Sequence, residues 1–276
     1  ALIALAAPAG AAPQRVVSMN LCTDQLALML GAPGQLVSVS AWSARPSASD
    51  LAEQAARLPL NRGGAEQVYT LRPDLVLAGA FTNRASVALL RRLGLRVEVF
   101  PPARSFAELR ESIARMGRLL GREDAAAALD AAFLAELAAL RARAGRLARR
   151  GAAFHYPNSY TSGTDTLAHE IMESAGLDNA AARLGLAGVA RLGLERLVML
   201  RPFLIRTETL SGAATGRSYE PARHPALAEV AAAAGGAVLA ERWQVCGTPF
   251  VTRAIAALLA AREGSGGERG GGGEGE

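Results

Sequence analysis

The chain has 276 residues and is 50% hydrophobic, which is enough for two compact lobes, each with a core of its own. Its net charge of +5 comes from arginines that are spread along predicted helices without interleaved aromatic residues, which argues against nucleic-acid binding. Beyond the first residues, no apolar run reaches the roughly 18 residues that a membrane-spanning helix needs.

The two ends of the chain differ in composition from the rest. Residues 1–11 are apolar and then small, and Ala9-Gly10-Ala11 fits the small-x-small rule for signal peptidase. We interpret them as the remnant of a secretory signal, which predicts a soluble protein exported to the periplasm. Residues 263–276 are rich in glycine and glutamate, and this composition predicts a disordered tail.

Residues 14–121 alternate between short apolar runs and amphipathic stretches, a βαβ pattern that predicts a parallel sheet covered by helices. The predicted strands are Arg15–Met19, Leu36–Val39, Leu75–Ala78 and Val97–Phe100. The predicted helices include Asp24–Leu30, Arg84–Leu93 and Phe106–Leu120. This half is therefore expected to form a Rossmann-like N-terminal lobe of the α/β class.

The next segment, residues 122–150, contains a long predicted helix from Glu123 to Arg150. Apolar residues recur on one face every three or four positions, and acidic residues at its start and arginines at its end complement the helix dipole. At this length it would span about 42 Å, more than one small lobe. We expect a stiff connecting helix between two lobes.

Residues 151–262 repeat the pattern of the first half and predict a C-terminal lobe. Glu66, Leu71-Arg72-Pro73 and the apolar run after them recur with the same spacing as Glu195, Leu200-Arg201-Pro202 and the run that follows. Both copies predict a short helix, a break at proline and a buried strand. This repeat favours an internal structural duplication.

Several segments together resemble the periplasmic binding proteins of iron-chelate and vitamin B12 ABC importers. They are RVVSMN, LRPDLVLAG, LRRLGLRVEVF followed by SFAELRESIARMGRLLG, and YTSGTDTLAHEIMESAGLDNAA. The resemblance covers about residues 14–262. It implies two Rossmann-like lobes joined by one rigid helix, with a metal chelate, a ferric siderophore, a cobalamin-type corrinoid or haem, held between the lobes and delivered to an inner-membrane ABC permease.

The resemblance also implies docking to the permease through one outward carboxylate on each lobe. The corresponding position in the first lobe falls near Asn83–Arg84, which is not acidic. The second copy of the repeat also has Phe203 where the first has Asp74. We expect a monomer that carries its ligand alone.

Ligands of open α/β lobes lie beyond the carboxyl ends of the strands, so the loops there are the candidate site. Aromatic side chains in these loops would cover a bulky chelate, and arginines would bind its carboxylate or phosphate groups. The candidate ligand-binding residues are Trp42, Arg45, Phe81, Tyr156, Tyr160, Arg206 and Trp243.

No set of residues predicts a resident metal or cofactor. His169 and Glu173 lie one helical turn apart with nothing visible to join them, although His155 and Tyr156 could offer an axial ligand to haem iron. The sequence contains no Gly-x-Ser-x-Gly elbow, no P-loop and no Gly-x-Gly-x-x-Gly after a strand. We therefore expect no enzyme activity. The alternatives are a two-lobed enzyme such as a nucleotide-sugar transferase, and a solute receptor for signalling.

Cys22 and Cys246 are the two cysteines of the chain, and both are predicted in loops at strand ends. They could be buried free thiols, metal ligands or a disulfide between the lobes. Export would make a disulfide chemically available, but pairing requires Cα atoms within about 7 Å of each other. The sequence alone leaves the three interpretations open.

Overall fold

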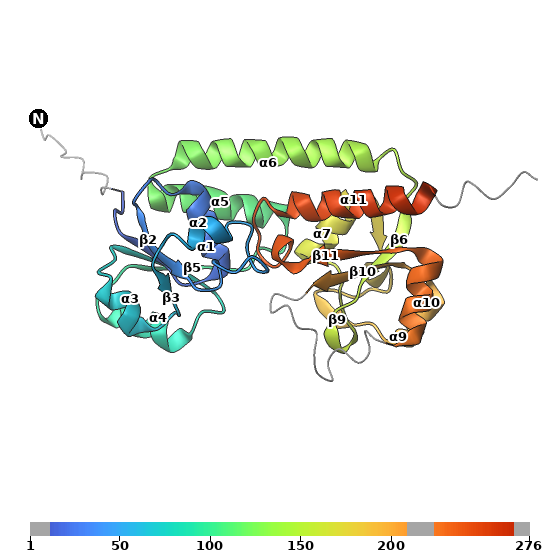
Figure 1. The fold of residues 1–276 in the computed structure, drawn as a ribbon, viewed down its shortest axis with the longest axis horizontal. Coiled ribbons are helices and arrows are strands. Elements are labelled where there is room, and N and C mark those ends of the chain that lie inside the picture. The colour runs from blue at the N-terminus through green and yellow to red at the C-terminus, as the bar shows by residue number, and fades with distance from the viewer. Residues whose placement is uncertain (1–11, 209–223, 268–276) are drawn as a thin grey trace, which may run out of the picture.

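The computed structural model describes residues 12–208 and 224–267. Two α/β lobes lie side by side beneath one long helix (Figure 1). The predicted fold class, two α/β lobes with parallel sheets joined by a long helix, is confirmed. The predicted signal remnant, residues 1–11, lies outside the described residues.

The N-terminal lobe is built on a five-stranded parallel sheet with the order β3-β2-β1-β4-β5, counted over the described residues. Its strands are β1 (Val16–Ser18), β2 (Leu36–Ser40), β3 (Leu60–Asn61), β4 (Leu75–Gly79) and β5 (Val97–Phe100). Its helices are α1 (Leu21–Leu30), α2 (Ala52–Ala55), α3 (Ala65–Thr70), α4 (Arg84–Arg92) and α5 (Phe106–Leu120). Strand β4 is buried along its whole length, as expected for a parallel sheet with helices on both faces.

The connecting helix α6 (Glu123–Ala144) has 22 residues and spans about 33 Å. The prediction of a helix to Arg150 is wrong at its C-terminal end, because Gly145 caps the helix and Arg150 already begins the next strand. Glycine has a low helix propensity, and here the chain turns down into the second lobe. The buried side chains Phe133 and Leu137 lie on the predicted apolar face of the helix.

The C-terminal lobe contains a parallel sheet of four strands with the order β11-β10-β6-β8, and a small antiparallel pair, β7-β9, among the described residues. Its strands are β6 (Arg150–Phe154), β7 (Tyr160–Ser162), β8 (Leu177–Asn179), β9 (Val189–Arg191), β10 (Phe203–Glu208) and β11 (Gly236–Ala240). Its helices are α7 (Leu167–Ser174), α8 (Ala180–Arg183), α9 (Leu194–Leu200), α10 (Pro225–Ala234) and α11 (Val251–Gly267), with 3-10 turns η1 (Pro157–Ser159) and η4 (Glu241–Trp243).

The predicted tail begins later than expected, because α11 continues through Gly267. Glu263, which we assigned to the disordered tail, forms an ion pair with Arg143 of α6. The part of the tail beyond residue 267 lies outside the described residues. Helices α6 and α11 thus pack side by side over the C-terminal lobe (Figure 1).

The two copies of the sequence repeat have the same backbone geometry at the ends of their helices. Arg72 and Arg201 end helices α3 and α9 in the left-handed region, with φ of 48° and 42°, and each precedes a proline. A residue before proline is disfavoured in the right-handed helical region. Both repeat segments therefore leave their helix in the same way and continue into a buried strand. This agreement supports the internal duplication.

Each lobe has a hydrophobic cluster of its own, as expected, and a third, larger cluster joins the two lobes. A continuous cluster of buried residues runs from the N-terminal sheet, through helices α5 and α6, into the C-terminal sheet. Phe133 of α6 meets Phe106 of α5 edge-on, with ring centroids 5.7 Å apart. Because α6 packs on both lobes through this layer, it fixes their relative position.

Candidate ligand-binding site

A cavity of about 750 Å³ lies at the carboxyl ends of the N-terminal strands. Loops that follow all five strands of that sheet contribute to its lining, and Val245 and Gly247 of the C-terminal lobe close one side. This is the edge at which open α/β sheets bind ligands, and the volume lies within the ordinary range of small-molecule sites, about 300–1,000 Å³.

Three of the predicted ligand-binding residues line this cavity, namely Trp42, Arg45 and Phe81. The guanidinium carbon of Arg45 lies 4.2 Å from the centre of the Trp42 ring, so the two side chains form one stacked wall. The Phe81 side chain is 86% exposed and reaches no core. Exposed aromatic side chains at a cavity rim provide area for a bulky ligand.

Sequence reasoning missed Arg62, which follows β3, and Pro101 and Pro102, which follow β5. The signal for the prolines was present, since they follow directly after a predicted strand. Strand β3 has only two residues and carries no recognisable pattern, so nothing in the sequence marked Arg62 as a residue at a strand end.

The carboxyl group of Asp24, on α1, is fully buried beneath residues that line the cavity. Its Oδ2 accepts hydrogen bonds from the backbone N–H of Ser40, at 3.1 Å, and from the Ser40 hydroxyl. Its Oδ1 has no hydrogen-bond partner among the described residues. Burial raises the pKa of Asp24 to about 7, although hydrogen bonds from nearby serine hydroxyls oppose the shift.

The predicted residues of the C-terminal lobe do not line this cavity. Tyr156 packs against Phe154 and shares a hydrogen bond of 3.1 Å with Ser162, and burial raises its pKa. Tyr160 is partly exposed and stacks with Arg191. Arg206 lies exposed on β10. The described residues therefore place the cavity almost wholly on the N-terminal lobe.

Trp243 has a different position from the one predicted, because its indole N–H donates to Asp50 of the other lobe at 2.8 Å. Arg242 and Arg253 bind the same carboxylate, at 2.6 and 2.7 Å. Asp50 is only 11% exposed at its side chain. We call these four residues the interlobe clasp, since they connect the start of α2 to η4 and α11.

Cys22 and Cys246 form a disulfide in the structure, with Cα atoms 5.1 Å apart. Cys22 lies at the N-terminal end of α1 and lines the cavity. The bridge ties the loop of residues 244–248 against the cavity wall. Together with the clasp, it joins the lobes beside the binding cavity.

The described residues contain no group of three or more His, Cys, Asp or Glu side chains that could hold a metal ion. His155 is buried and neither ring nitrogen has a hydrogen-bond partner. Burial, together with the positive charge of Arg206, lowers its pKa and favours the neutral imidazole. The amide Nδ2 of Asn179 donates to Nδ1 of His169 at 3.3 Å, and His169 belongs to no such group among the described residues.

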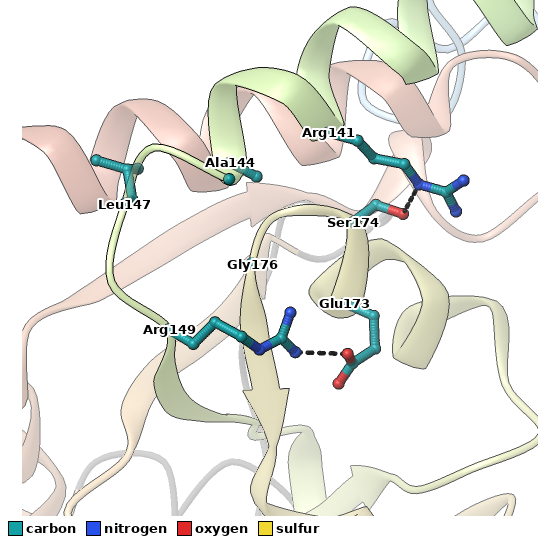
Figure 2. A pocket seen from close by; sticks show the side chains of 8 residues that line it. Arg141, Ala144, Leu147, Arg149, Glu173, Ser174 and Gly176 are labelled. Atoms are coloured by element: carbon teal, nitrogen blue, oxygen red, sulfur yellow. Dashed lines mark hydrogen bonds and ion pairs between the residues drawn. The ribbon is translucent and has the colours of Figure 1, made fainter.

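A second cavity, of about 360 Å³, lies at the far end of α6, away from the strand ends (Figure 2). Arg141 donates to the Ser174 hydroxyl at 3.1 Å, and Arg149 pairs with Glu173 and Asp178. The charge of Arg149 is thus paired with carboxylates, whereas the guanidinium of Arg141 donates to a neutral hydroxyl. It is a gap where the connecting helix enters the second lobe.

A protein-family model described as periplasmic binding protein matches residues 16–240. The chain belongs to the periplasmic binding protein family. Membership in this family confirms the expected binding role in place of catalysis. Among the described residues, no helix is long and apolar enough to cross a membrane.

Relatives of this periplasmic binding protein include a cobalamin-binding protein of Halobacterium salinarum. It is 34% identical over 173 residues, which cover 62% of this chain and 47% of that protein. An uncharacterised ABC transporter substrate-binding lipoprotein of Bacillus subtilis, YvrC, is 27% identical over 204 residues, covering 71% and 63%. The chain thus spans about half to two thirds of the length of these relatives.

The solved structure of the periplasmic haem-binding protein RhuT from Roseiflexus matches with a TM-score of 0.71. The match covers 90% of this chain and 99% of that protein at 21% sequence identity. At this identity the match establishes the two-lobed fold of the binding protein and leaves its ligand open.

Proposed function

We propose that this protein is the substrate-binding component of an ABC importer and that it captures a metal chelate in the cavity beside the interlobe clasp. The observation that carries the proposal is the cavity itself. It collects loops from every strand of the N-terminal sheet and has Trp42, Arg45 and Phe81 on its wall. Aromatic area with a few polar groups suits a bulky, rigid chelate better than a small ion.

The names of similar proteins support a chelate as the ligand and a transporter as the partner. One relative is named a cobalamin-binding protein, another an ABC transporter substrate-binding lipoprotein, and a protein of the same fold binds haem. We include ferric siderophores, corrinoids and haem in the proposed ligand class. The proposed partner is an inner-membrane permease.

We also propose export through the N-terminal signal and action as a monomer in the periplasm. The carboxylate expected for permease docking near Asn83–Arg84 is absent, and Asn83 instead caps α4 at the cavity rim. A docking contact on this lobe would therefore use other residues.

Tryptophan fluorescence tests the proposal, because the chain has two tryptophans in different surroundings. A coloured chelate bound in the cavity should quench the emission, and Trp42→Phe should remove most of that signal. Trp243→Phe is the matched control, since Trp243 faces Asp50 and not the cavity, and it should leave most of the quenching. Absorbance and native mass spectrometry of protein from its own host would identify the bound species.

Two outcomes would contradict the proposal. No response to ferric siderophores, cobalamin or haemin, together with binding of a nucleotide sugar, would favour the enzyme alternative. Binding of a small solute alone would favour a signalling receptor.

A further inference from the structure

Three polar side chains at the cavity accept hydrogen bonds from backbone N–H groups through their oxygen atoms. Asn20 accepts from the Cys22 N–H at 3.0 Å, and Thr82 accepts from the Gly79 N–H at 3.0 Å. Asn83 accepts from the first N–H groups of α4, at 2.9 and 3.1 Å. The amide NH₂ of each asparagine and the hydroxyl proton of Thr82 are not used in these contacts, so they can donate to a ligand.

Two arginines add positive charge to the same cavity, and no carboxylate on its lining opposes them. Arg45 and Arg62 line the cavity, are exposed, and form no ion pair among the described residues. By contrast, Arg242 and Arg253 of the interlobe clasp both form ion pairs with Asp50. The carboxyl of Asp24 lies buried below the floor and does not line the cavity.

The described lining also lacks side chains that would bind an open coordination position of a metal. It contains no His, Tyr, Asp or Glu, and Cys22 is held in the disulfide. The Met19 thioether is 6% exposed. A metal in this cavity must therefore have its coordination positions filled by the chelator.

We propose, on the basis of the proposed function, that the cavity selects an anionic chelate whose metal is fully coordinated by oxygen-rich ligand groups. Peripheral carboxylate oxygens of such a chelate accept from the Asn and Thr donors and form charge-assisted hydrogen bonds with Arg45 and Arg62. A ferric complex of a polycarboxylate or hydroxycarboxylate chelator has this chemistry. Cobalamin carries one phosphodiester charge among neutral amides, so it would leave one of the two arginines without a counter-charge. Haem would find no axial ligand in the described lining.

The test compares four probes by isothermal titration with the whole protein: ferric dicitrate, ferrioxamine B, cyanocobalamin and haemin. Ferric dicitrate and ferrioxamine B hold the same metal in oxygen ligands but differ in the sign of their charge. The proposal expects ferric dicitrate to bind tightest, and Arg45→Gln and Arg62→Gln each to weaken it about tenfold or more. Arg57→Gln is the matched control, an exposed arginine of the same lobe outside the cavity.

The outcomes separate the two proposals. Equal or tighter binding of ferrioxamine B or cyanocobalamin would overturn the anionic selectivity. Equal or tighter binding of haemin would overturn the requirement for a fully coordinated metal, and either result would leave the transport role intact. Loss of ferric dicitrate affinity in Arg57→Gln equal to that in the cavity variants would also overturn it, because the effect would then follow net charge alone. Failure of all four probes to bind would overturn the chelate-binding function itself.

Discussion

Replacing Asp24 with asparagine should make the protein more stable at alkaline pH, an unusual result for a change in a fully buried polar group. The Asp24 carboxyl is completely buried on α1, and burial raises its pKa to about 7 from an ordinary value of 3.8. The folded state therefore favours the protonated, neutral carboxyl.

The sign of the effect follows from which state holds the proton. Between pH 4 and pH 7 the folded protein keeps the Asp24 proton that the unfolded chain releases, so stability falls as the pH rises through this window. Above pH 7 the loss of stability from ionising the buried Asp24 carboxyl is complete and no longer changes with pH. The difference between the two pKa values corresponds to about 4 kcal/mol of lost stability.

Asp24→Asn removes the ionisation but keeps an oxygen to accept from the Ser40 N–H and hydroxyl. The stabilities of the variant and the wild type should be compared by urea unfolding at pH 5 and pH 8. Between these two pH values the variant should gain about 3 kcal/mol relative to the wild type, because the part of the penalty that builds up below pH 5 is already present at the lower pH. Asp165→Asn, at an exposed position, is the control and should show no such shift. A difference for Asp24→Asn that is the same at both pH values would refute the reasoning.

Four further predictions concern the connections between the lobes. Cys22→Ser with Cys246→Ser should lower stability by about 5 kcal/mol, with no free thiols detectable in unreduced wild type and two in reduced wild type. Asp50→Asn should cost about 2 kcal/mol in urea unfolding, because it leaves two arginines without their counter-charge. Phe133→Ala should cost about 3–5 kcal/mol, and a smaller cost would show that α6 does not share the common core. Solution scattering should give the same radius of gyration for empty and loaded protein, and a large closure would contradict the fixed lobes.

The sequence was sufficient for features that depend on local pattern. The repeat around Glu66 and Glu195, the apolar face of α6 and the aromatic loops with Trp42 and Phe81 all follow from residue spacing. The end of α6 was misplaced because arginines and alanines continue the helical pattern beyond Gly145, while the turn into the second lobe depends on tertiary packing.

What the sequence could not supply were contacts between residues far apart in the chain. Trp243 looked like a cavity residue because it follows a predicted strand, but its indole binds a carboxylate 193 residues away. The short strand β3 carries Arg62 into the cavity and has too few residues for any periodicity. Both cases required knowledge of which loops meet, which local pattern does not contain.

The way in which the lobes are joined bears on how the cavity gains affinity. Helix α6 connects them through the large common cluster, while the disulfide and the interlobe clasp connect them beside the cavity. A ligand therefore meets walls that are already in place, including Val245 and Gly247 from the second lobe. Binding to such a site loses little free energy to reorganisation, so selectivity must come from the groups on the wall and not from closure. We therefore expect Arg45, Arg62 and Trp42 to contribute most to the selection of the ligand.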